Sequence, residues 1–114
     1  MKKFNNREFK IWDYRYSHSS LLIRSRWQGT NIDLIFEEVK FISIPETMNG
    51  LEIIEDKEQY HEEIIEIHGS YIEIDNLFIL RSEGRLGYIV ARLLEVQENN
   101  LEHHQSSLDP KLYL

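Results

Sequence analysis

The sequence predicts an all-β fold: an antiparallel two-sheet sandwich or a partly open barrel of about eight strands, with at most one short helix. Three observations lead to this prediction. Apolar and polar residues alternate in short runs, the runs are rich in aromatic and β-branched residues, and turn-forming residues separate them at short intervals. The length of 114 residues fits a single domain, because a chain of this size buries enough surface for one core.

The first strands of the chain follow from this alternation. Residues 8–16 alternate, residues 17–20 form a polar break, and residues 21–27 follow as a hairpin partner. In that partner strand Leu21, Ile23 and Trp27 share one face. A turn at residues 28–31 then precedes a third strand over residues 32–36.

The alternation breaks at Glu37 and Glu38 and resumes from Val39 to Ile44. A bulge or bend near Glu38 would restore the inward face, and Pro45 then ends the strand because it has no amide proton to donate. The pair Asn49-Gly50 predicts a turn before a short strand at residues 51–54.

The remaining sequence predicts three further strands. Residues 55–63 fit either a short helix or a loop, because Tyr60 and Ile64 are helically spaced whereas the isoleucines that follow fit a strand. Turn signals then divide the chain into strands at 71–74, 77–81 and 86–96, and the last has mixed faces that predict burial on both sides. We therefore expect one domain over residues 1–97 and a polar tail or short peripheral helix over residues 98–114.

Core positions follow from the apolar face of each strand. This face predicts burial of four side chains, Phe36, Phe41, Ile79 and Val90.

Composition excludes several classes of chemistry. The chain has no cysteine, so disulfides, thiolate zinc sites and cysteine nucleophiles are absent. Charged residues interrupt every hydrophobic segment, so we expect no membrane span. The charged N-terminus has no apolar run behind it, which predicts no signal peptide and a cytoplasmic location.

Charge is distributed unevenly along the chain. Seven basic and two acidic residues give +5 over residues 1–30, two basic and thirteen acidic residues give −11 over residues 31–76, and residues 77–114 carry −1. The acidic segment would repel nucleic acid and attract a basic protein surface. The alternative is that the basic N-terminal strands pair with the acidic middle inside one sheet.

No histidine spacing predicts a metal site. His61 and His68 form the best cluster with the acids between them, but on a helix they would lie about 10 Å apart, too far to share one zinc ion. His103 and His104 fall in the tail, and we expect no metal and no cofactor.

The remaining patterns also predict structure rather than catalysis. Adjacent acids such as Glu62-Glu63 point to opposite faces of a strand, and His18 with its neighbouring serines lacks a nucleophile elbow. The glycines of residues 82–87 fit a hairpin loop that opens no helix, so they form no phosphate cradle.

Aromatic and basic residues alternate near the N-terminus in a pattern typical of a nucleic-acid surface. Core packing of the aromatics with outward arginines explains the same residues, and the acidic total favours this interpretation. The residues concerned are Tyr14, Tyr16, Trp27, Arg15, Arg24 and Arg26.

Three blocks of the sequence resemble a family of small uncharacterised bacterial proteins. They are residues 17–25, residues 31–36 with Val39 and Pro45, and residues 96–99 with 106–108. The resemblance covers most of the chain and implies a compact β-rich fold with no catalytic residue to carry over. Size, charge and β content are also similar to those of the small acidic immunity proteins of bacterial toxin systems.

The leading functional hypothesis is therefore a non-enzymatic binding protein, such as an immunity-type inhibitor, with a basic protein partner. One alternative is a ligand-binding or enzymatic domain with a cavity between two sheets. A second is a self-associating module, in which the apolar run 77–80 forms the edge or face of a homodimer. The candidate partner-binding residues are Glu37, Glu38, Glu55, Asp56, Glu58, Glu62 and Glu63.

Overall fold

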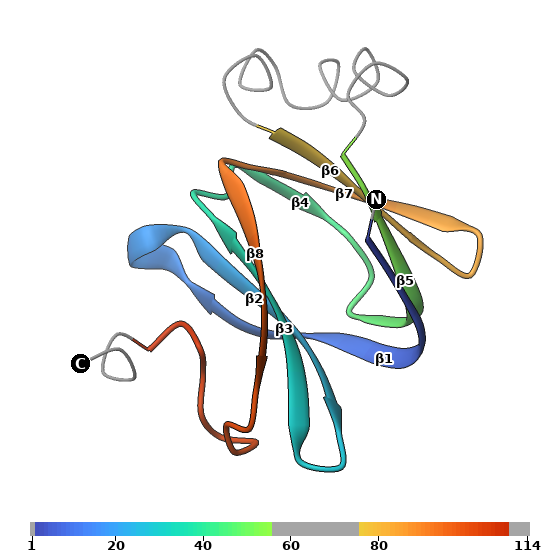
Figure 1. The fold of residues 1–114 in the computed structure, drawn as a ribbon. Helices are drawn as coiled ribbons and strands as arrows, with labels where there is room; N and C mark the ends of the chain where they lie inside the picture. The colour runs from blue at the N-terminus through green and yellow to red at the C-terminus, as the bar shows by residue number, and fades with distance from the viewer. Residues whose placement is uncertain (1, 56–75, 110–114) are drawn as a thin grey trace.

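The computed structural model describes residues 2–55 and 76–109 and confirms the all-β prediction (Figure 1). Eight antiparallel strands form one sheet that is not closed into a barrel, in the order β4-β7-β6-β5-β1-β2-β3-β8. The helical structure in the described residues is one short 3-10 turn, η1. The elements are β1 (Lys2–Arg15), η1 (Tyr16–His18), β2 (Ser20–Trp27), β3 (Thr30–Glu37), β4 (Phe41–Ser43), β5 (Thr47–Ile54), β6 (Asn76–Ser82), β7 (Arg85–Ala91) and β8 (Leu93–Asn99).

The long strand β1 is where the sheet bends. Its first part pairs with β5 and its last part pairs with β2, and the register slips once along each pairing. Extra residues at such slips interrupt the ladder and increase the local twist. The continuous sheet can therefore fold over until the β4-β7-β6-β5 half faces the β2-β3-β8 half (Figure 1).

The core fills the space between the two halves. Fourteen buried apolar side chains of the described residues form one cluster, and within it Phe36 on β3 lies against Phe78 on β6 with 5.4 Å between ring centroids. Of the four predicted core residues, Phe36, Ile79 and Val90 are fully buried. Phe41 is only partly buried, because it packs at the rim of a second cluster on the other face of β6 and β7.

The bend predicted near Glu38 is confirmed. Glu38 has a φ of 52°, and the chain passes there from β3 in one half of the sheet to β4 in the other. The Arg92 amide donates to the Glu37 carbonyl and the Lys40 amide donates to the Val90 carbonyl. These two hydrogen bonds connect the bend at Glu38 to the point at Arg92 where the chain changes direction between β7 and β8.

Several strand boundaries differ from the prediction. Asn49 and Gly50 lie inside β5 instead of forming a turn, because Gly50, with a φ of 70°, faces the register slip in β1. The run 86–96 is two strands, because Arg92 marks the passage between the halves of the sheet. The predictions for residues 56–75 lie outside the described residues.

The segment 100–109 lies on the outer face of β2 and β3. Its main-chain carbonyls accept hydrogen bonds from side chains of the sheet. Arg26 and Asn31 donate to the Leu101 carbonyl. Trp12 donates to the His103 carbonyl, and Arg24 donates to the Gln105 carbonyl. This cover explains why residues 20–25 are buried without a break, although every second side chain of a strand points away from the core.

Candidate functional site

Three of the predicted partner-binding acids lie at one end of the sheet, which we call the acidic corner: Glu37, Glu38 and Glu55. Glu37 ends β3, Glu38 forms the bend that follows it, and Glu55 follows the last residue of β5. β5 pairs with β6, and β6 pairs with β7. β7 ends at Ala91, and the next residue, Arg92, is hydrogen-bonded to Glu37 at the bend near Glu38. The strand order therefore places at the same end of the sheet acids that are far apart in the sequence.

Hydrogen bonds and one ion pair organise this corner. The Ser20 hydroxyl donates to a Glu37 carboxylate oxygen at 2.7 Å, and Arg92 Nε lies 2.6 Å from a Glu38 carboxylate oxygen. The side chains of Arg92 and Glu38 are both more than half exposed, so water screens this pair. The Asn76 amide group donates to the Arg92 carbonyl, which ties the start of β6 to the same point.

The other four candidate acids, Asp56, Glu58, Glu62 and Glu63, lie outside the described residues. So do His61 and His68. His18 is exposed at the end of η1, and His103 and His104 lie in the segment over the outer face of the sheet. Across residues 2–55 and 76–109, no three His, Asp or Glu side chains are grouped in a way that could hold a metal ion.

The expected core packing of the N-terminal aromatic residues is wrong, and the expected exposure of the arginines is wrong for Arg24. Tyr16 is 88% exposed and Trp27 is 64% exposed, because both stand beyond the region where the two halves of the sheet face each other. Arg24, expected to point into solvent, is fully buried.

Arg24 forms a buried ion pair with Asp33 on the neighbouring strand. Its Nε and Nη2 donate to the two carboxylate oxygens at 2.7 and 2.9 Å, and its guanidinium carbon lies 5.3 Å from the centroid of the Trp12 ring. The Asn99 amide donates to the same carboxylate. The register of the β2–β3 hairpin, set by the turn at Gln28-Gly29, was the sequence signal that could have placed Arg24 opposite Asp33.

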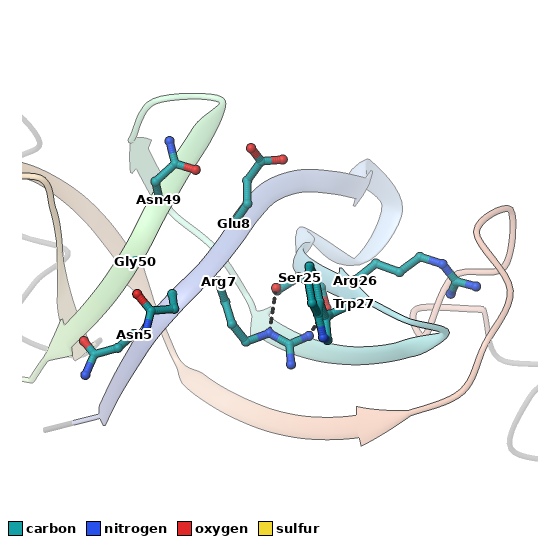
Figure 2. A pocket seen from close by; sticks show the side chains of 9 residues that line it. Asn5, Arg7, Glu8, Ser25, Arg26, Trp27, Asn49 and Gly50 are labelled. Atoms are coloured by element: carbon teal, nitrogen blue, oxygen red, sulfur yellow. Dashed lines mark hydrogen bonds between the residues drawn. The ribbon is translucent and has the colours of Figure 1, made fainter.

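A polar hollow lies at the opposite end of β3 from Glu37, beside Trp27 (Figure 2). It has a volume of about 820 Å³, and β1, β2 and β5 contribute its lining. Sequence analysis missed this site because its residues converge from three strands. The lining consists of Asn5, Asn6, Arg7, Glu8, Ser25, Arg26, Trp27, Asn49 and Gly50.

Arg7 is held in a fixed position within this hollow. Its Nε donates to the Ser25 hydroxyl at 2.9 Å, and its Nη2 donates to the Ser25 carbonyl at 3.1 Å (Figure 2). A third, longer contact reaches the Thr30 carbonyl. The Arg7 guanidinium therefore ties β1 to the β2–β3 hairpin.

No protein-family model, curated protein or solved structure matches this chain. Within the part of the chain that the structure describes, no helix has the length and apolar character needed to cross a bilayer.

Proposed function

We propose that this protein is a non-enzymatic binding protein whose partner is a basic protein, and that it acts as an immunity-type inhibitor. The observation that carries the proposal is the convergence at the acidic corner. From Glu55 to Asn76, both included, the sequence contains eight acidic residues and one basic residue. Both ends of this stretch are attached to the corner that holds Glu37 and Glu38.

Such a concentration of negative charge favours encounter with a positive surface. Complementary charge raises association rates by steering diffusion, and it disfavours partners of the same sign. An acidic inhibitor can occupy the anion-binding surface of a basic toxin such as a nuclease, and nucleic acid itself would be repelled.

The two alternative functions receive less support. A cavity between two sheets has little support, because the fourteen side chains of the core fill the space between the two halves of the sheet. The hollow beside Trp27, and a second hollow lined in part by Ser20, are open at the surface. The run 77–80, expected to form a dimer edge or face, is buried within β6, which has β5 and β7 on its two sides.

The experiment uses the full chain as bait in an extract of the source organism. Wild-type bait is compared with the double variant Glu38→Lys/Glu55→Lys, which reverses two exposed charges of the acidic corner. A control, Glu83→Lys/Glu98→Lys, makes the same change in net charge at exposed positions of the β6–β7 turn and β8.

We expect a basic protein to be retained by wild type and by the control, and to be lost from the corner variant. Equal retention by all three baits, or a captured partner with an acidic surface, would contradict the proposal. Circular dichroism of each bait checks that the sheet is intact.

A further inference from the structure

The hollow beside Trp27 shares no residue with the acidic corner, and its lining has a different composition. Trp27 supplies the only aromatic or aliphatic side chain among the nine residues of its lining, and this indole is 64% exposed. An indole has a large apolar face, and covering that face is favourable. An exposed indole at the rim of a hollow can therefore stack against a ligand. The other lining residues supply amides, a hydroxyl, guanidinium groups and a carboxylate.

Two of the three charged side chains that line the hollow, Glu8 and Arg26, have a partner of opposite charge within the protein. Glu8 lies 3.5 Å from the ammonium of Lys10, and Arg26 lies 3.8 Å from the carboxylate of Glu102. Arg26 also donates to the Leu101 carbonyl and to the Asn31 amide oxygen. The third, Arg7, donates to neutral oxygen atoms, so one positive charge remains and a ligand for this hollow needs no large net charge.

Hydrogen-bonding groups nevertheless remain available in the hollow. The side chains of Asn5, Asn6 and Asn49 make no hydrogen bond within the described residues. Arg7 uses Nε and Nη2 for Ser25, which leaves Nη1 for a ligand. The left-handed conformations of Asn6, with a φ of 58°, and Gly50, with a φ of 70°, shape the backbone that presents these groups.

We propose that this hollow is a binding site for a neutral sugar. One face of a pyranose ring carries C–H groups that can stack on the exposed indole of Trp27. The ring edge carries hydroxyl groups that both donate and accept hydrogen bonds, as the asparagine amides and Arg7 require. The volume of about 820 Å³ falls within the usual range for ligand sites and leaves room for more than one ring.

Other ligand classes fit these residues less well. A nucleotide would bring phosphates, which are held best by several unpaired cations, whereas Arg26 is already paired and Arg7 offers a single cation with one free nitrogen. A protein anchor fills a well-packed, desolvated pocket, whereas the lining here is polar apart from Trp27. The site is independent of the acidic corner, because β3 separates the two by roughly 23 Å from Thr30 to Glu37.

The chain allows a direct test, because it contains only two tryptophans. In a ¹H–¹⁵N spectrum of the full chain, each indole N–H gives one signal. We expect neutral mono- and disaccharides of glucose, galactose, mannose or N-acetylglucosamine, at concentrations up to about 20 mM, to shift the Trp27 signal. The Trp12 signal should stay in place, because its N–H donates to the His103 carbonyl outside the hollow.

Variants make the test specific. Trp27→Ala lacks the indole reporter, so its binding is followed through the backbone amide signals of the lining residues, and it should be weaker for the best sugar by at least about tenfold, the loss of roughly one stacking contact. Asn49→Ala, which removes a free amide, should weaken it by about three- to tenfold. Tyr16→Ala removes a more exposed aromatic outside the hollow and should leave binding unchanged.

Three results would overturn the proposal. The first is that no sugar shifts the Trp27 signal, and the second is that Trp12 and Trp27 shift equally. The third is that uridine monophosphate or a tryptophan-rich peptide shifts Trp27 where sugars do not, which would assign the hollow to another ligand class.

Discussion

Arg24 is one of the residues that hold the segment 100–109 on the sheet. Its guanidinium pairs with Asp33, stacks on Trp12 and donates to the Gln105 carbonyl at 2.7 Å. Both members of the pair are fully buried, so each removes from the other the cost of a buried unpaired charge. The pair therefore joins β2, β3 and the C-terminal segment.

Replacing Arg24 with methionine should lower the free energy of unfolding by about 3–5 kcal/mol, because the Asp33 carboxylate would stay buried without its cation. The double variant Arg24→Met/Asp33→Leu should lose less than the sum of the two single variants. Urea denaturation of all four proteins measures this coupling. Additive losses would show that the two side chains act independently.

Asp13 fixes the same segment and predicts a pH dependence. Burial alone would raise the pKa of Asp13, but hydrogen bonds from Ser106 and Arg15, the charge of Arg15 and the Tyr14 amide together lower it below its ordinary value. A lowered carboxyl pKa stabilises the fold above the unfolded-state pKa, and this contribution is lost as pH falls through the folded-state pKa.

Asp13→Asn should therefore be less stable than wild type at neutral pH, and the difference should shrink below about pH 4. Urea denaturation at neutral and acidic pH measures it. A difference that stays constant through this range would contradict the role assigned to the Asp13 carboxylate.

At the level of elements, alternation alone predicted most strands and the bend at Glu38. It failed at Asn49-Gly50, because a left-handed glycine that faces a register slip has the same local signal as a turn glycine. It also merged β7 with β8, because the change of direction at Arg92 depends on its hydrogen bond to Glu37, which is distant in sequence.

Close approach of β4 and β7 depends on Gly87. A Cβ at this position would lie 2.7 Å from Ile44 Cγ2 and 3.0 Å from the Ser43 carbonyl oxygen. Gly87→Ala should therefore destabilise the protein by about 1–3 kcal/mol through overpacking. Gly84→Ala, where no atom lies within 4 Å but φ is +75°, isolates the cost of backbone strain alone. If Gly87→Ala is as stable as wild type in thermal denaturation, the two strands are less tightly packed than described.

For the whole molecule, stability depends on contact between the two halves of the sheet. Phe36 is fully buried and touches Phe78 across the core. Phe36→Ala should cost about 3–5 kcal/mol, a large part of the stability of a small domain. Denaturant unfolding measures this loss. A loss below about 1 kcal/mol would mean that the halves do not depend on this contact.

The candidate sites were only partly predictable from the sequence. The acidic composition was visible, but the gathering of Glu37, Glu38 and Glu55 at one corner depends on strand order. The hollow beside Trp27 was not visible, because Asn5, Trp27 and Asn49 are brought together only by the pairing of β1 with two different strands.

The most direct test of the central claim is the association rate of the captured basic partner at two ionic strengths. The variant is Glu38→Lys/Glu55→Lys, which reverses two exposed charges of the acidic corner, and the control of equal charge change is Glu83→Lys/Glu98→Lys. We expect the melting temperature of the first variant to stay close to wild type, as for surface charges. Its association should slow by about tenfold at low salt and depend less on salt, while the control changes much less. Equal slowing in both variants, or association that salt does not affect, would contradict a function that acts through the acidic corner.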